Sequence, residues 1–149
     1  MKLTLQGHDY KYAIEQILLM MYPEERPVYS EDAAALSAVV SIQLGSTYAV
    51  AVTRLTSQGS AYTGTSRVKR TALTDKLTTD RLLQKIIKRS FYKAAVSERS
   101  RNHPAWKQPV WGALTGIRPG KIASALLLRG YSDEKTLKTL TNEYFVSPA

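Results

Sequence analysis

Four stretches of the chain alternate apolar and polar side chains with a period of two, the pattern of half-buried β-strands. They are residues 2–6, 36–44, 47–55 and 61–69. Short runs of turn-forming residues separate the last three, with Gly45-Ser46 at the first turn and residues 57–60 at the second. The pattern therefore predicts an antiparallel meander of three strands, which the first segment extends to a four-stranded sheet.

Elsewhere the apolar positions recur every three or four residues, which predicts helices. The expected helices span residues 10–21, 75–96 and 119–129, and a further one begins after the N-cap residue Ser132. The second helix carries an apolar stripe opposite a cationic one, and we expect the apolar stripe to cover the sheet. The predicted fold class is α+β: a small, mainly antiparallel four-stranded sheet covered by two helices and followed by a small helical extension.

In residues 97–109 the apolar positions follow neither the strand period nor the helix period, and the segment contains two prolines. We therefore predict a loop there. We place an α+β N-terminal domain at residues 1–109 and a glycine-rich motif with the helical extension at residues 110–149. The last residues suit the beginning of another helix, with Ser147 as its N-cap and Pro148 as its first residue. We therefore expect the natural polypeptide to continue beyond residue 149.

Composition limits the kinds of function. The chain has 149 residues, no cysteine and two histidines, which excludes a disulfide framework, a thiolate zinc site and a cysteine nucleophile. No nucleophile with a base and no pair of carboxylates can be singled out, so we expect neither a catalytic residue nor a metal site in this part of the protein. The sequence contains no apolar run of about eighteen residues and no apolar core of a signal peptide. We therefore expect a cytoplasmic protein without a membrane span.

Positive charge is concentrated in the middle of the chain. Residues 61–131 carry fifteen Lys/Arg and three Asp/Glu, within a total net charge of +9. Such a block attracts anionic partners. Its basic and aromatic loop candidates are Arg99, Arg101, Trp106, Lys107 and Trp111. Tryptophans beside guanidinium groups can stack nucleobases, which favours a basic nucleic-acid (RNA)-binding module, whereas the alternative is that each tryptophan anchors the loop to the core.

A glycine recurs every fourth residue at positions 112, 116 and 120, directly before the helix expected at residues 119–129. Glycine permits positive φ and close approach of the main chain, and Pro119 suits the first turn of a helix. Backbone N–H groups there would bind a carboxylate or phosphate together with flanking cations. The candidates for this substrate or anion site are Gly116, Arg118, Gly120 and Lys121. The alternative is a tight connector whose arginine is merely solvated.

The motif Trp111-Gly-Ala-Leu-Thr-Gly-Ile-Arg-Pro119 continues through Lys121-Ile122 and Gly130-Tyr131 to Tyr144-Phe-Val-Ser147. This set resembles the region just before the catalytic domain in HemZ-type oxygen-independent coproporphyrinogen III oxidases, also called coproporphyrinogen dehydrogenases. These are radical-SAM enzymes of haem, and hence porphyrin, biosynthesis. The resemblance covers about the last forty residues, and before them only the order of elements agrees.

The resemblance implies a parent oxidoreductase that oxidatively decarboxylates coproporphyrinogen III to protoporphyrinogen IX. Radical-SAM enzymes hold an iron-sulfur cluster on a CxxxCxxC set of thiolates, and this chain has no cysteine. S-adenosylmethionine and the [4Fe–4S] cluster are therefore expected in a catalytic domain that lies outside this sequence. The implied partners of this N-terminal domain are that C-terminal catalytic domain and the anionic tetrapyrrole substrate, which Arg118 and Lys121 would help to orient.

Overall fold

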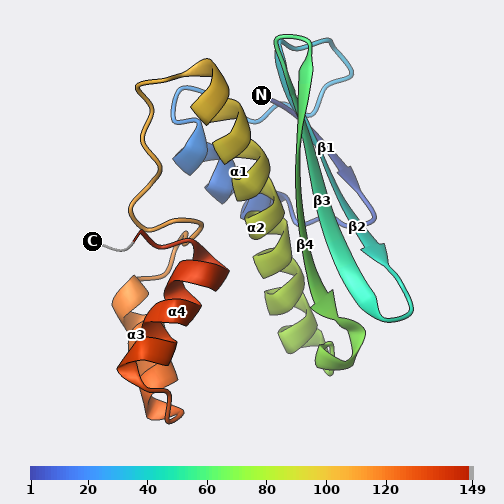
Figure 1. Cartoon of the computed structure of the whole chain (residues 1–149). Coiled ribbons are helices and arrows are strands. Elements are labelled where there is room, and N and C mark those ends of the chain that lie inside the picture. Colours follow the sequence, from blue (N-terminus) through green and yellow to red (C-terminus); the bar gives the residue numbers. More distant parts are fainter. Residues whose placement is uncertain (148–149) are drawn as a thin grey trace. The chain divides into compact units, whose positions relative to one another are not determined.

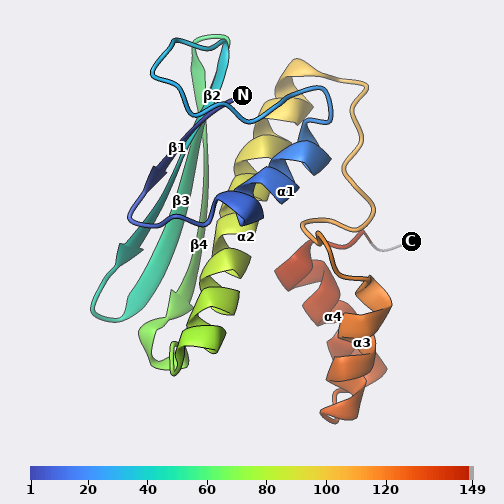
Figure 2. The ribbon, with the colours of Figure 1, turned by 180° about the vertical axis from the view of Figure 1, so that it is seen from behind.

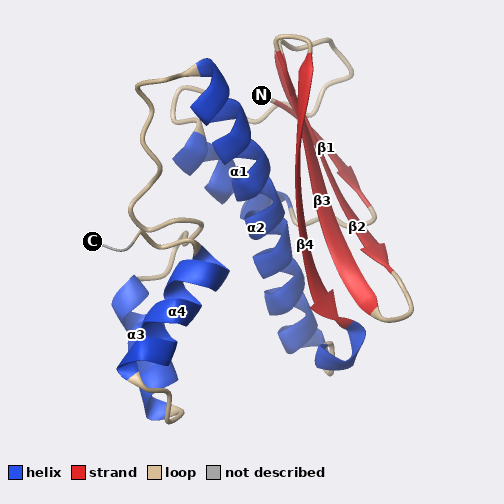
Figure 3. Cartoon of the chain, in the orientation of Figure 1, coloured by secondary structure: helices blue, strands red, loops and turns tan. Residues whose placement is uncertain are grey.

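A computed structural model of the chain describes residues 1–147 and divides into two units, Met1–Trp106 and Lys107–Ala149. The N-terminal unit contains the four strands and the helices α1 and α2, and the C-terminal unit contains the helices α3 and α4 (Figure 3). The helix expected to begin at Pro148 lies outside the described residues.

The four strands of the N-terminal unit form one sheet in their sequence order. They are β1 (Lys2–Gln6), β2 (Leu36–Leu44), β3 (Tyr48–Ser57) and β4 (Ser60–Lys69). Strands β2, β3 and β4 are antiparallel neighbours, which confirms the predicted meander, and β1 runs parallel to β2 at the opposite edge. Gln58 and Gly59 both have positive φ at the β3–β4 turn. This is the conformation of a two-residue hairpin turn that matches the right-handed twist of the flanking strands. The predicted α+β class is confirmed.

Both helices of this unit cover the same face of the sheet (Figures 1 and 2). Helix α1 spans Lys11–Met21 and helix α2 spans Lys76–Asn102. The core lies between the helices and the sheet and includes Ile14, Ile17, Val40, Leu55 and Phe91, all fully buried. These are the apolar stripes that the two periodicities predict, packed face to face.

Helix α2 is longer than the predicted helix at residues 75–96 and ends six residues later, at Asn102. Its N-cap is Asp75, whose side chain accepts a hydrogen bond from the Thr78 N–H at 2.8 Å. Its last two turns continue because Glu98 and Arg99 are buried and bonded to the rest of the unit. The segment 97–102 was therefore wrongly predicted as loop: its polar side chains have partners that only the folded chain supplies.

The C-terminal unit contains helix α3 (Pro119–Leu128) and helix α4 (Asp133–Tyr144), which confirms the expected helical extension. Gly130 has φ +87° directly after α3, and the N–H of Tyr131 bonds to the Leu126 carbonyl at 3.1 Å. Ser132 caps α4 by accepting a hydrogen bond from the Lys135 N–H. The start signals of both helices and the stop signal of α3 thus agree with the observed bounds.

His8 lies at the entrance of α1 and is held in its neutral form. Its Nε2 is 2.9 Å from the Val40 carbonyl oxygen, which can only accept, and its Nδ1 accepts a hydrogen bond from the Tyr10 N–H at 3.1 Å. Burial lowers the pKa of His8 below 6.5, although the Val40 hydrogen bond and the charge of Asp9 oppose this shift. A proton on Nδ1 would remove the acceptor for Tyr10.

We expect the free energy of unfolding to decrease as the pH falls through 6.5 toward the lower pKa of folded His8. The unfolded chain binds the proton more tightly than the folded one, so the contribution of His8 is complete above 6.5 and is lost below it. Urea unfolding at several pH values would measure this slope. His8→Gln should flatten it and His103→Gln should retain it, whereas equal slopes in wild type and His8→Gln would contradict the assignment.

Candidate functional site

The glycine-rich motif and the end of α4 form one hydrogen-bonded element in the C-terminal unit. The Ala113 N–H donates to the Tyr144 carbonyl at 2.8 Å, and the Ser147 N–H donates to the Val110 carbonyl at 2.8 Å. Gly112 has φ +59°, and a Cβ there would lie 2.2 Å from the Tyr144 carbonyl oxygen. Only glycine fits this approach. The two segments that carry the family resemblance therefore lie side by side.

Arg118 and Lys121 lie at the start of α3 and are both exposed. The chain turns at Gly116, which has φ +72°, and Pro119 opens the helix. Among residues 1–147, no side chain caps this helix. Gly120 differs from the expectation, because it lies in the helical turn and a Cβ added there would have no atom within 4 Å. The backbone thus requires glycine at 112 and 116, and not at 120.

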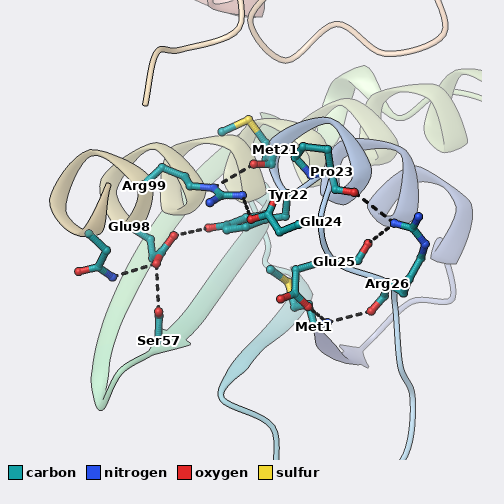
Figure 4. Close-up of polar contacts among 11 residues, drawn as sticks. Met1, Met21, Tyr22, Pro23, Glu24, Glu25, Arg26, Ser57, Glu98 and Arg99 are labelled. Carbon is teal, nitrogen blue, oxygen red and sulfur yellow. Dashed lines mark hydrogen bonds and ion pairs between the residues drawn. The ribbon is translucent and has the colours of Figure 1, made fainter. Parts of the chain in front are cut away.

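Arg99 belongs to the interior of the N-terminal unit and not to a basic surface (Figure 4). Its Nε donates to the Met21 carbonyl at 3.0 Å, and its guanidinium pairs with Glu24 and stacks over the Tyr22 ring at 4.2 Å. Burial alone would raise the pKa of Glu24, but its hydrogen bonds and the charge of Arg99 lower it. This candidate for nucleic-acid contact is used to attach α2 to the end of α1.

Next to Arg99, the carboxylate of Glu98 is buried and accepts three hydrogen bonds (Figure 4). The donors are the Tyr22 hydroxyl at 2.9 Å, the Ser57 hydroxyl at 3.0 Å and the Asn102 amide at 2.8 Å. Burial and the neighbouring Glu98 charge raise the pKa of Tyr22. A buried carboxylate satisfied in this way joins helix, sheet and α1 and is a structural group.

The other loop candidates are distributed over both units. Arg101 is exposed on the last turn of α2, and Trp106 is half-buried at the end of the N-terminal unit. Lys107 and Trp111 are exposed and belong to the C-terminal unit. Neither unit by itself brings the two tryptophans together, so stacking of one ligand between them stays a prediction.

A basic hollow that the sequence did not predict lies between β4 and α2. It is open to solvent, has a volume of about 380 Å³ and is lined by Thr65, Ser66, Arg67, Arg89 and Lys93. Three of the five side chains are cations and none is acidic. The Lys93 ammonium donates to the Thr65 carbonyl at 2.8 Å, and the Arg67 guanidinium lies 4.2 Å from the centre of the Tyr48 ring. We call this site the β4–α2 hollow.

The Arg67 side chain starts on the other face of the sheet from the two cations of α2. Cross-strand register places all the charged residues of the strands, Lys2, Arg54, Arg67 and Lys69, on the sheet face opposite the helices. No strand contains Asp or Glu. Arg89 and Lys93 are four residues apart and hence adjacent on one side of α2. The spacing of apolar residues in the sequence shows which side of α2 is polar. It could not show that the side with Arg89 and Lys93 meets the edge of β4.

Comparison with protein-family models, with curated proteins and with solved structures finds no match for this chain. Within the described part of the chain, no group of three or more His, Cys, Asp or Glu side chains could hold a metal ion. No helix there is long and apolar enough to cross a membrane. The groups arranged for binding are thus the exposed cations at the start of α3 and those of the β4–α2 hollow, and both suit anions.

Proposed function

We propose that this chain is the N-terminal, non-catalytic domain of an enzyme that resembles oxygen-independent coproporphyrinogen III oxidase. The observation that carries the proposal is the hydrogen-bonded pairing of residues 110–113 with residues 144–147, the two segments that contain the resembling motifs. Sequence motifs far apart in the chain that meet in one element act as a structural unit. In the proposal this unit joins the domain to a catalytic radical-SAM domain.

The surface of the C-terminal unit supports a docking role. Its small core contains Ala113, Leu114, Leu126 and Val146, whereas large apolar side chains stay exposed. These are Val110, Trp111, Ile117, Leu127, Leu128 and Leu137. A helix with Leu128 at 89% exposure leaves apolar area in water that a partner surface would bury. The proposed partner is the catalytic domain of the same polypeptide, which would supply the cluster and S-adenosylmethionine.

Arg118 is the residue that we propose to serve the substrate, because it lies at the start of α3 and coproporphyrinogen has four carboxylates. A guanidinium binds a carboxylate through two parallel hydrogen bonds, which lysine cannot reproduce. The exposed Lys121 in the first turn of α3 adds a second positive charge. The proposed role is orientation of the substrate or of a carboxylate of the catalytic domain, with no covalent step by this chain.

In the full-length enzyme, Arg118→Ala and Arg118→Lys should both lower kcat/KM for coproporphyrinogen by about tenfold to a hundredfold, the loss of one charge-assisted contact. Thermal unfolding should change little, because Arg118 is exposed. Arg129→Ala removes another exposed arginine of the same unit and should retain activity. Unchanged turnover in both Arg118 variants would refute the role of Arg118, and the lack of a CxxxCxxC segment downstream would refute the enzyme assignment.

The nucleic-acid alternative has less support at the loop where the sequence placed it. Arg99 is buried in the network of Figure 4, and of the remaining candidates only Arg101, Lys107 and Trp111 are exposed. The stronger basic surface is the β4–α2 hollow, which lies in another part of the N-terminal unit.

A further inference from the structure

We propose that the face of the sheet opposite the helices binds single-stranded nucleic acid. Both helices of the N-terminal unit cover the other face (Figures 1 and 2), and we call the uncovered side the open face. The contacting groups are the cations Arg54, Arg67 and Lys69 and the hydroxyls of Thr63 and Thr65, all exposed. The inference does not rest on the enzyme assignment above, because these residues lie outside the segments that carry the resemblance.

The direction of the β4 side chains follows from Gly64. This residue faces α2, where an added Cβ would lie 2.0 Å from the Ser90 carbonyl oxygen. Its neighbours in the strand, Thr63 and Thr65, therefore point away from the helix, and so do the residues that continue the alternation. Arg54 of β3 is the cross-strand partner of Thr63 and lies on the same face.

The outward side chains of β4 form a row along the edge strand of the sheet. Residues two apart on one face of a strand are separated by about 7 Å, so the row from Thr63 to Lys69 extends over about 20 Å. This spacing is close to that of neighbouring phosphates in an extended nucleic-acid strand. A small anion would reach two adjacent side chains, whereas a chain of phosphates would contact the whole row.

The open face is positive and has no acidic neighbour on the strands, since no strand contains Asp or Glu. The three acids of residues 61–131 belong to α2 or its cap: Asp75 caps the helix, Asp80 accepts from a tyrosine and Glu98 is buried. Lys2 is not part of the site, because it donates to the Glu31 carbonyl at 3.1 Å beside an acidic connector. Positive charge of this kind attracts a polyanion, which binds with release of its counterions.

Arg67 is ordered by a tyrosine of the neighbouring strand. Its guanidinium lies 4.2 Å from the centre of the Tyr48 ring. Stacking on the ring uses one face of the guanidinium and leaves the other face and the N–H donors at its edge. An unpaired base can stack on that other face while the edge donates to a phosphate. Because Arg67 is already ordered, it loses less conformational entropy on binding.

The shape of the open face favours a single strand over a duplex. The major groove of a duplex admits a helix or a two-stranded ribbon, and a four-stranded sheet is wider than either. The outward residues between the cations are short, namely Thr63, Thr65 and Val52. Unpaired bases can therefore approach the sheet, whereas the bases of a duplex stay stacked inside it.

A membrane surface fits the open face less well, because binding to lipid needs apolar side chains that insert beside the cations. Within the four strands, the large apolar side chain that is exposed is Leu44. Leu44 pairs with Ala49, which is buried on the helix-covered face. The valines at outward positions, Val39, Val50 and Val52, are half-buried.

The test is binding of the whole chain to a fluorescent oligouridylate of about twelve nucleotides, measured by anisotropy at several salt concentrations. Arg67→Gln should weaken binding by at least about tenfold, through loss of a phosphate contact and a stacked base. It should also reduce the slope of log K against log salt by about 0.7, the amount for one phosphate of a single strand. Arg67→Lys should retain the slope and recover only part of the affinity, because it keeps the charge without the stacking plane.

Arg81→Gln is the matched control, because it removes the same charge from an exposed position of α2, in the layer on the other face of the sheet. Its affinity should stay within about twofold of wild type, with an unchanged slope. Circular dichroism checks the fold of each variant, and Arg54→Gln and Lys69→Gln provide further variants if Arg67→Gln does not fold. Backbone amide NMR signals should shift at residues 48–54 and 63–69 on binding.

Three competitors test the assigned partner: poly-glutamate, phosphatidylserine vesicles and an RNA duplex of the same length. Weak competition by all three would support single-stranded nucleic acid. Displacement of the oligouridylate by one of them at equal charge would assign the face to an acidic protein, a membrane or a duplex and overturn the proposal. The proposal is also overturned if the oligouridylate does not bind, or if Arg81→Gln and Arg67→Gln weaken its binding equally.

Discussion

Substitution of Gly64 by alanine is expected to destabilise the N-terminal unit by about 3 kcal/mol or more, and valine by more still. The added Cβ would lie 2.0 Å from the Ser90 carbonyl oxygen, a backbone atom that cannot move without its helix. Helix α2 would have to retreat from β4 and would open the core around Phe91, which is fully buried. Urea unfolding followed by circular dichroism measures the loss.

Ala61→Val is the matched control for Gly64, because it adds volume to the same strand on the exposed face. We expect it to change the free energy of unfolding by about 0.5 kcal/mol or less. A Gly64→Ala variant as stable as wild type would show that α2 does not rest on β4 at this point.

Glu98→Ala should destabilise the same unit by about 3–5 kcal/mol. Removal of the Glu98 carboxylate leaves three donors without the acceptor that they share. They are the Tyr22 hydroxyl, the Ser57 hydroxyl and the Asn102 amide. The neighbouring Arg99 keeps its own carboxylate partner, Glu24. Breaking one member of a buried polar network leaves its other members desolvated and uncompensated.

Thermal or urea unfolding of Glu98→Ala and of Glu31→Ala provides the comparison, because Glu31 is exposed and the same atoms are removed. Glu98→Gln should fall between wild type and alanine, since its amide keeps one acceptor oxygen. Equal stability of Glu98→Ala and Glu31→Ala would mean that the carboxylate is not part of the core.

The sequence concentrates its cations in residues 61–131. The fold distributes this block over separate surfaces and, at Arg99, the interior.

Much of the fold follows from local signals in the sequence. Alternation predicts the three strands of the meander, Ser132 caps α4 as expected, and Gly130 follows α3 in the left-handed conformation. Such signals act within a few residues and need no distant partner, which is why the sequence reveals them. The sequence also determined the uneven charge and the lack of cysteine.

Only the tertiary structure decided what depends on contacts between distant segments. The last turns of α2 look like a polar loop until Glu98 and Arg99 meet Tyr22 and Glu24 from the end of α1. Gly64 looks like a weak position in a strand until Ser90 lies against it. Periodicity records which side of an element is apolar, but burial of a charge and close approach of two backbones depend on which partner packs there.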